Sequence, residues 1–420
     1  MVSCRVFMSR ALQINRSSIG RRSLHITATH HQSAPGPLTR LTEDERLLQE
    51  SVRRLAQDKL LPRVRAMEQQ GRVDQDVLDQ LFQAGLMGAE LEPEIGGSGC
   101  GFLGLMLAVE ELARVDASLA VLVDIQNTLV VAIIRRFGTE EQRRRYLPLL
   151  AQSWVGSFCL SEAGSGSDAF ALSCKAKKDS QGQYVIDGSK LWISNSDVAK
   201  IFVVFARLEG TGPADGHRGV TAFLVERDTP GLEIARPERK LGLEASGTCA
   251  LQFNGVKAQL LGEAGVGYRY AAALLNESRV GIGAQMIGLA RGCLDATLPY
   301  LMERRQFGQP IWGFQSVQHQ VARMATELEC SRLLVYNAAR CVEAGEDVRM
   351  PASMAKLHSS EMAQRVASQC IDLMGGLGFT KDYPQEKFYR DCKAGTIYEG
   401  TSNMQLTTIA KCIEKIQAQS

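Results

Sequence analysis

One glutamate of the sequence stands where a carboxylate could act on a bound ligand. In Ile397-Tyr-Glu-Gly-Thr-Ser-Asn403, Glu399 lies between an aromatic residue and a glycine, and the glycine leaves space beside the carboxylate. Ser402-Asn-Met-Gln405 matches an N-terminal capping box, which predicts that a helix begins here and that Glu399 lies on the loop before it. Most glutamates are solvated surface residues, but Tyr398 and Gly400 favour a functional role for this one.

A second candidate is a loop of small residues that could approach a ligand closely. Phe158-Cys-Leu-Ser-Glu-Ala-Gly-Ser-Gly-Ser-Asp168 combines two glycines with the hydroxyl donors of Ser161, Ser165 and Ser167. Such a loop suits a planar heterocycle with several acceptors. A Gly/Ser turn on the surface is an equally good interpretation from local chemistry alone.

Trp192 and Ser194 form a third candidate, after the strand-like run 188–191. Tryptophan offers a stacking surface, and residues two apart on a strand face the same side. Ser194 could therefore hydrogen-bond the edge of a ring that stacks on Trp192. A tryptophan buried in the core is the more ordinary interpretation of Trp192 taken alone.

An arginine and paired glycines nearer the C-terminus could bind phosphate groups. Arg304 begins the run Arg-Arg-Gln-Phe-Gly308, Gln315 follows a few residues later, and Met374-Gly-Gly-Leu-Gly378 contains three glycines. Arginine binds phosphate through two parallel hydrogen bonds, and glycines permit close backbone approach to a diphosphate. A charged helix end followed by a glycine cap is the alternative.

Three segments of different periodicity must position these residues. Residues 42–155 have helical spacing of apolar residues after a capping box at Thr42 to Glu45. Residues 156–265 contain short β-rich runs separated by turn residues, which predict an antiparallel sheet. Over 266–420 four long helical segments predict a four-helix bundle: 268–302, 315–344, 350–374 and 403–416. The order α, β, α predicts an α+β multidomain fold.

Composition and charge narrow the class of protein. A chain of 420 residues is too long for one domain, and 45% hydrophobic with 22% charged residues is ordinary for a globular protein. No run approaches 18 consecutive apolar residues, so we expect no membrane span. After residue 42 the chain carries 42 basic and 46 acidic residues, a net charge of −4, which disfavours nucleic acid as a partner.

The first residues predict targeting to mitochondria. Residues 1–42 contain six arginines, no lysine and no acid. Residues 1–33 therefore predict a mitochondrial transit peptide, cleaved between Arg22 and Pro35, and a matrix location. A disordered basic tail is the alternative.

Metal and nucleotide motifs are missing from the sequence. The eleven cysteines contain no C-x-x-C, which suits a reducing compartment, and His217, His319 and His358 are isolated, so we expect no metal site. Neither a dinucleotide-binding G-x-G-x-x-G after a strand, nor a P-loop, nor a G-x-S-x-G elbow is present.

Taken together, the candidate motifs resemble the acyl-CoA dehydrogenase family. The order F-C-L-S-E-A-G-S-G-S-D, W-I-S, R-x-x-F-G, M-G-G and Y-E-G-T covers essentially the whole chain after the presequence, and five motifs at this spacing are specific. The resemblance implies an N-terminal α-helical domain (42–155), a middle antiparallel β domain (156–265) and a C-terminal four-helix domain (266–420), usually in a homotetramer. Segments 115–120, 125–129 and 395–400 are most similar to members specific for short, branched acyl chains.

The resemblance also implies FAD as cofactor, with some of its ligands on a neighbouring subunit. Arg304 and Gln315 would reach the neighbour's FAD, while Trp192 would cover the flavin ring and Ser194 would hydrogen-bond its N5 atom. The implied cofactor-binding residues are Phe158, Cys159, Leu160, Ser161, Glu162, Ala163, Gly164, Ser165, Gly166, Ser167, Trp192, Ile193, Ser194, Arg304, Gln315, Asp372, Leu373, Met374, Gly375, Gly376, Thr401, Ser402 and Asn403.

The same resemblance implies the substrate contacts and makes Glu399 the catalytic base. The implied acyl-CoA contacts are Ser167, His217, Tyr268, Asn276, Glu277, Ser278, Arg279 and Gly400. Burial should raise the pKa of Glu399, and the following helix N-terminus should oppose part of that rise. A minority of the family carries its base at the position of Ser278, and Glu277 is one residue away, about 100° around a helix. We therefore expect Glu399 to be the base.

Dehydrogenation of a short, 2-methyl-branched acyl-CoA to the trans-2-enoyl-CoA is the function that the resemblance implies, with electrons passed to electron-transferring flavoprotein. A straight short-chain (butyryl-CoA) dehydrogenase is the nearest alternative, since one methyl group is worth only about 1–3 kcal/mol. An acyl-CoA oxidase and a non-catalytic assembly factor on the same fold are further ones. The oxidase is disfavoured because the chain lacks a large C-terminal extension, and the assembly factor because Glu399 and the 158–168 loop are intact.

Overall fold

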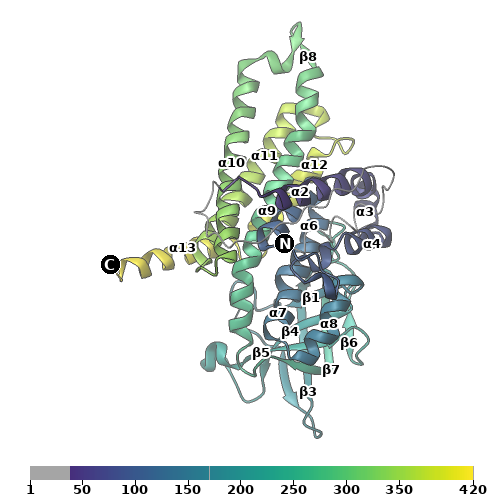
Figure 1. Cartoon of the computed structure of the whole chain (residues 1–420), viewed down its shortest axis with the longest axis vertical. Coiled ribbons are helices and arrows are strands. Elements are labelled where there is room, and N and C mark those ends of the chain that lie inside the picture. Colours follow the sequence, from purple (N-terminus) through teal and green to yellow (C-terminus); the bar gives the residue numbers. More distant parts are fainter. Residues whose placement is uncertain (1–37, 170, 420) are drawn as a thin grey trace, which may run out of the picture.

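The structure is a computed structural model that describes residues 38–169 and 171–419. The predicted transit peptide, residues 1–33, lies outside the described residues. The three regions follow one another as predicted, helical, then β, then helical. In Figure 1 the sheet lies at the bottom and the long C-terminal helices extend from it to the top.

The N-terminal region opens with the predicted capping box. The Thr42 side chain accepts a hydrogen bond from the Glu45 amide, and the Glu45 side chain accepts one from the Thr42 amide, at the start of α2 (Glu43–Leu55). The helices that follow are α3 (Val64–Gln70), α4 (Gln75–Gln83), α5 (Phe102–Ala113), α6 (Ala117–Asp124), α7 (Ala132–Phe137) and α8 (Glu140–Gln152).

One helix of this region is apolar enough to cross a membrane by length and composition. Helix α6, a π-helical stretch (Ile125–Val131) and α7 form a continuous helix of 21 residues, Ala117–Phe137, and its most apolar window of 18 residues has a mean hydropathy of 2.0. Its apolar window is entirely buried inside the protein, which is the position of a core helix. The count of uninterrupted apolar residues missed it because Asp124 and polar residues of the π-helical stretch interrupt the run.

The middle region forms a seven-stranded sheet that is mixed instead of purely antiparallel. Strand β4 pairs in parallel with β1 and β2 and antiparallel with β5. The chain reaches β4 only after the β2–β3 hairpin, which brings it back in the direction of β2. Pairing of β4 with β5 closes β4, β2, β3, β7 and β5 into a ring. The strands are β1 (Gly156–Cys159), β2 (Lys175–Lys178), β3 (Tyr184–Ile193), β4 (Ile201–Leu208), β5 (Val220–Glu226), β6 (Leu232–Ile234) and β7 (Cys249–Leu261).

Alternate side chains of β4 pack into two different hydrophobic cores, one within the sheet and one shared with the helices. Phe202 and Val204 belong to a small core of sheet residues, while Val203 and Phe205 belong to the large core built mainly from helices. Both faces of β4 are therefore buried, which explains its unbroken apolar sequence. The 209–219 segment joins β4 to the antiparallel strand β5 as a hairpin connection.

The C-terminal region contains the four predicted helices and one further helix. Helices α9 and α10 are joined by a small hairpin of β8 (Arg305–Gln306) and β9 (Gln309–Pro310). The helices are α9 (Gly267–Glu303), α10 (Gln315–Glu343), α11 (Arg349–Met374), α12 (Gln385–Cys392) and α13 (Ser402–Gln417).

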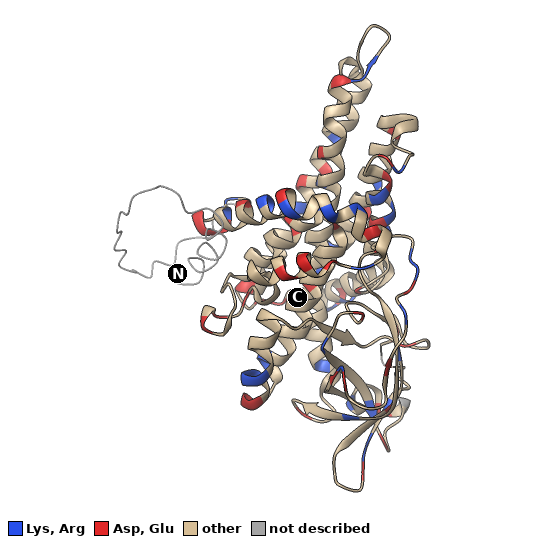
Figure 2. Ribbon diagram, turned by 90° about the vertical axis from the view of Figure 1, so that its right-hand side faces the viewer, with Lys and Arg blue, Asp and Glu red and all other residues tan. Residues whose placement is uncertain are grey.

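Helix α13 departs from the predicted four-helix bundle. It contacts α11 but extends away from the other helices, with the C-terminus at its tip (Figure 1). The left-handed backbone of Glu399 (φ 51°) and Gly400 (φ 83°) turns the chain just before it, and helical periodicity carries no information about that direction. Acidic and basic residues are intermixed along the ribbon in Figure 2, in keeping with the nearly balanced charge.

Candidate active site

The loop that carries Glu399 is held by side chains from two helices. Glu399 has φ 51°, which is uncommon for a residue other than glycine. Lys356 of α11 donates to the Gly400 carbonyl (Nζ···O 2.6 Å), and Gln405 of α13 donates to the carbonyls of Glu399 (3.2 Å) and Gly400 (2.8 Å). These three hydrogen bonds fix the backbone from which the carboxylate projects.

The Glu399 carboxylate faces polar groups of α9 and α11. The Ser278 hydroxyl donates to Glu399 Oε2 at 2.6 Å. Burial raises the pKa of Glu399, and the Ser278 hydrogen bond and the positive charges of Lys356 and Arg279 limit the rise. Arg279 donates in turn to Asn276 Oδ1 at 2.8 Å, which orients its guanidinium. The predicted base therefore lies in an environment that brings its pKa nearer to neutrality.

Asp124 is a second buried carboxyl beside Glu399 that the sequence analysis missed. It is fully buried at the end of α6, and burial together with the Glu399 charge raises its pKa well above the ordinary value. Its Oδ1 lies against α9, where a Cβ added to Gly281 would be only 1.9 Å away. In the sequence, the one sign of this role was that Asp124 is an acid within the largely apolar run 119–137. Lys356 was missed too, because nothing local indicates that it meets residue 400.

Glu277 points away from the base, as its position on the helix predicts. Both of its oxygens accept from Arg136, at 2.6 Å each. Ser278, the next residue, faces Glu399 instead. Glu277 therefore forms an ion pair with Arg136 of α7, while its neighbour Ser278 contacts the base.

The cap of α13 differs from the predicted capping box. Thr401, not Ser402, is the capping residue, and its side chain accepts from the Met404 amide at 3.4 Å. Gln405 is one residue too far along to complete a box with Thr401, and it hydrogen-bonds the Glu399 loop instead. The position of Glu399 on the loop before the helix is confirmed. The Ser402 hydroxyl is buried without a partner among the described residues.

Two side chains of the small-residue loop after β1 are held inside the protein. Cys159 is buried, and Glu162 accepts from Lys190 (2.7 Å) and Ser173 (2.6 Å), so neither side chain is available to a ligand. Despite its burial, Glu162 has a lowered pKa because Lys190 is adjacent. A Cβ at Gly164 or Gly166 would meet nothing within 4 Å, which leaves the outer side of the loop open.

Trp192 projects into solvent from an irregular end of β3. It has φ 62°, and the β3–β7 register shifts between Lys190 and Ile193, so the strand alternation used to place Ser194 beside Trp192 does not apply. The ring is 62% exposed, which rules out the core tryptophan. The Ser194 carbonyl accepts from the Ser157 hydroxyl at 2.9 Å and ties this turn to β1.

The predicted substrate contacts gather around the start of α9. The rings of His217 and Tyr268 lie 5.9 Å apart, so the 209–219 loop lies against this helix end. Asn276, Ser278 and Arg279 follow two to three turns along α9 from Tyr268. The structure thus brings these residues and Glu399 onto one helix–loop junction.

Several predicted cofactor residues lie at the opposite end of the bundle from Glu399. Met374 is about 18 residues further along α11 than Lys356, roughly 27 Å of helix. The Gln369–Gln320 hydrogen bond of 2.9 Å shows that the start of α10 lies beside this end of α11. Met374 is buried, and the exposed predicted residues at this end are Arg304, Gln315, Asp372, Gly375 and Gly376.

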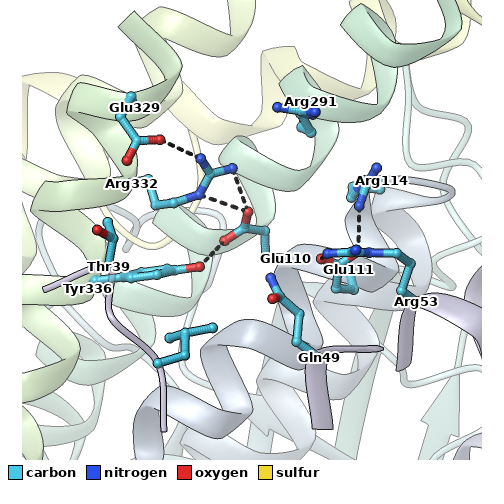
Figure 3. Close-up of a pocket in the computed structure, with 11 residues that line it drawn as sticks. Thr39, Gln49, Arg53, Glu110, Glu111, Arg114, Arg291, Glu329, Arg332 and Tyr336 are labelled. Atoms are coloured by element: carbon cyan, nitrogen blue, oxygen red, sulfur yellow. Dashed lines mark hydrogen bonds and ion pairs between the residues drawn. The ribbon is translucent and has the colours of Figure 1, made fainter. Parts of the chain in front are cut away.

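A cavity of about 360 Å³ lies elsewhere, where α2, α5, α9 and α10 meet, and shares no residue with the predicted site (Figure 3). Its charged side chains are paired with one another, except for Arg291, which pairs with Asp295. Arg332 contacts Glu110 (2.9 Å), and Arg53 and Arg114 both contact Glu111 (2.8 Å each). The Arg332–Glu110 pair joins α10 to α5, and Arg114 also pairs with Asp295 of α9 (2.6 Å), so these two contacts connect the N-terminal and C-terminal helices beside the cavity.

The α–β–α chain carries a partly buried carboxylate on a loop between helices, an exposed tryptophan and an open glycine loop, an arrangement that suits a flavin-dependent dehydrogenase. Comparison with known families agrees. Models of the acyl-CoA dehydrogenase N-terminal, middle and C-terminal domains match residues 42–153, 157–256 and 265–414. The chain belongs to the acyl-CoA dehydrogenase family, whose members are FAD-dependent oxidoreductases acting on CH–CH bonds.

Individual relatives agree with this assignment. The chain is 52% identical over 392 residues, 93% of this chain and 90% of the relative, to the mitochondrial short/branched chain specific acyl-CoA dehydrogenase of Rattus norvegicus. It also resembles the structure of butyryl-CoA dehydrogenase from Megasphaera elsdenii. The TM-score is 0.86 at 35% identity, and the match covers 89% of this chain and 99% of that chain. A second similar structure is that of an acyl-CoA dehydrogenase complexed with FAD from Bacillus anthracis. It has a TM-score of 0.84 and 27% identity, and the match covers 90% of this chain and 68% of that chain.

Proposed function

We propose that the protein dehydrogenates short acyl-CoA thioesters with a 2-methyl branch, such as 2-methylbutyryl-CoA, to the trans-2-enoyl-CoA in the mitochondrial matrix. The proposed electron acceptor is electron-transferring flavoprotein. The 52% identity with the rat short/branched chain specific enzyme supports the branched substrate. Residues 1–33, the proposed transit peptide, support the location through their composition.

The observation that carries the proposal is the Glu399 carboxylate, fixed on its loop by Lys356 and Gln405 and bonded at one oxygen to Ser278. Ser278 engages Oε2, which leaves Oε1 to take the α-proton of the thioester. Since burial raises the pKa of Glu399, the carboxylate is a stronger base than an exposed glutamate. The backbone amide of Glu399 would hydrogen-bond the thioester carbonyl and stabilise the developing enolate.

The residues present fit FAD, which when bound would accept the hydride from the β-carbon. Trp192 would cover the flavin ring from its exposed position, and the open loop 161–167 would hydrogen-bond it. The unpartnered Ser402 hydroxyl beside Thr401 and Asn403 offers a further polar contact. The predicted residues at the far end of the bundle would hold the FAD of another subunit in a homotetramer. We also propose that the three domains meet at 155/156 and 265/266.

Anaerobic reduction of the flavin tests the proposal directly. The holoenzyme is mixed with 2-methylbutyryl-CoA or butyryl-CoA near neutral pH, and loss of flavin absorbance is followed for the wild type and Glu399→Gln. We expect rapid bleaching by the branched substrate and a loss of at least about a thousandfold in the variant, because an amide cannot accept the proton. Glu233→Gln, at an exposed glutamate of β6, is the control and should bleach normally.

Each outcome has a definite meaning. Preferential bleaching by butyryl-CoA would assign the protein to the straight-chain class. Retained activity in Glu399→Gln would remove Glu399 as the base. A fully flavinylated wild-type enzyme that neither substrate bleaches would contradict the short-chain assignment.

A further inference from the structure

We propose that Ser278 is a positioning residue for the reaction, which orients Glu399 for proton abstraction by donating a hydrogen bond to its Oε2 atom. This inference rests on the proposed role of Glu399 as the base. This role is separate from the acyl-CoA contact that the family resemblance implies for Ser278, because in proton abstraction its hydroxyl would act through the carboxylate.

The geometry of the contact is that of a strong hydrogen bond. The distance from Ser278 Oγ to Glu399 Oε2 is 2.6 Å, within the range of a hydroxyl donating to an ionised carboxylate. Ser278 is fully buried in the first third of α9. A donor held on a rigid helix can therefore restrict a carboxylate that projects from a loop.

The other polar groups near the carboxylate have partners of their own. Lys356 of α11 donates to the Gly400 carbonyl, and Arg279 of α9 donates to Asn276, so both act on Glu399 through charge. Tyr398, on the same loop as Glu399, donates to Gln285. Among the described residues, Ser278 alone donates a hydrogen bond to the Glu399 carboxylate.

Burial of the Glu399 side chain gives this donor its importance. Asp124 of α6 is buried beside the base, and burial also raises the pKa of Tyr398 well above its ordinary value. In this setting burial favours the protonated, inactive form of Glu399, and Ser278, Lys356 and Arg279 oppose that effect. Removing the Ser278 hydroxyl should therefore raise the pKa of the base while leaving the rest of the site in place.

The test is the pH dependence of flavin reduction in the holoenzyme of Ser278→Ala, from pH 5.5 to 9, at saturating 2-methylbutyryl-CoA. We expect the acid limb of the rate profile to move up by about one pH unit, which lowers the rate roughly tenfold on that limb. Above the limb the rate should equal that of the wild type or exceed it slightly, because the base is then ionised in both enzymes.

Two controls separate this role from a structural one. Ser278→Thr keeps a hydroxyl at the same position and should restore the wild-type profile. Ser359→Ala removes another fully buried hydroxyl, which has no partner among the described residues, from α11, and should leave the acid limb unchanged. A second readout without turnover is the carboxyl absorption of Glu399 in infrared difference spectra against Glu399→Gln, whose titration midpoint should rise in Ser278→Ala.

The outcomes are distinguishable from failure of the proposed function. If Glu399→Gln abolishes bleaching but the acid limb of Ser278→Ala stays in place or moves down, the positioning role is wrong and the base assignment stands. A downward movement would mean that a protonated Glu399 donates to Ser278 instead. If Glu399→Gln remains active, the proposed base fails first.

Discussion

At the scale of single residues, the site depends on contacts between residues far apart in the chain. A non-glycine residue with positive φ costs on the order of 1–3 kcal/mol, and Glu399 has this conformation. Lys356 and Gln405 offset that cost through the carbonyls of the loop. The buried lysine is thus tied both to the conformation of the base and to its charge.

Lys356 gives a prediction about stability and pH. Burial lowers its pKa from 10.5 to about 8, so the folded protein loses this proton at a lower pH than the unfolded chain does. Between pH 8 and 10.5 the residue therefore contributes stability that increases with pH, about 3 kcal/mol across the window, and below pH 8 this contribution is lost. In Lys356→Met the contribution should be missing.

Chemical unfolding of wild type and Lys356→Met at pH 7, 8, 9 and 10 measures this difference. The variant should become progressively less stable relative to the wild type as the pH increases from 8. Lys59→Met, at an exposed lysine, serves as the control and should show no such trend. A constant difference across the series would contradict a buried lysine with a lowered pKa.

The sequence predicted the residue types of the site better than their contacts. Tyr398-Glu399-Gly400 indicated a carboxylate with space beside it, and the loop position is confirmed. The contacts of Asp124, Lys356 and Ser278 with this loop could not be predicted, because they join residues 43 to 275 positions apart through packing of α6, α9 and α11. Periodicity indicates which face of a helix is buried, not which loop it meets.

At the scale of elements, the position of α9, which carries Ser278, depends on its close packing against the N-terminal helices. Three glycines on α9 lie against the N-terminal helices. A Cβ at Gly281 would be 1.9 Å from Asp124, at Gly288 2.0 Å from the Glu110 carbonyl, and at Gly292 2.1 Å from the Arg114 carbonyl. The last two neighbours are backbone atoms, which cannot move aside as a side chain could.

Gly288→Ala should therefore lower stability by several kcal/mol, since α9 and α5 would have to separate. The expected result is a fall of several degrees in the midpoint of thermal unfolding, measured on the holoenzyme. Gly212→Ala is the matched control, because a Cβ there meets nothing within 4 Å and φ is −132°. Equal midpoints for the two variants would show that α9 can shift without cost.

The same scale shows where strand patterns failed. Alternation placed Ser194 beside Trp192, but the register shift after Lys190 and the positive φ of Trp192 break the period at this point. Alternation along β4 was not interpretable either, because this strand is buried on both faces. Irregular strand ends near a site are common, and bulges there redirect a side chain.

At the scale of the whole molecule, α13 leaves an apolar surface uncovered. Leu406, Ile413 and Ile416 are about half exposed and share one side of a helix that projects from the protein (Figure 1). A stripe of this kind on a projecting helix suits a contact between subunits, in line with the proposed homotetramer.

Leu406→Glu combined with Ile413→Glu should weaken that assembly. Light scattering after size-exclusion chromatography should show smaller species, and the FAD content per chain should fall, because part of the cofactor site is proposed to lie on another subunit. Thr407→Glu combined with Lys411→Glu, exposed positions outside the stripe on the same helix, is the control. Unchanged mass for the first variant would exclude α13 from the interface.

The length of α11 has a genetic consequence. Its two ends contribute to different reaction centres in the proposed assembly: Lys356, which holds the Glu399 loop, lies at one end, and the Asp372–Gly376 turn lies at the other, roughly 27 Å along the helix. Two defective alleles, one altered at each end, would therefore not behave as two null alleles in the same cell. Mixed oligomers would contain some centres built wholly from intact halves, so a compound heterozygote would retain activity that neither homozygote has.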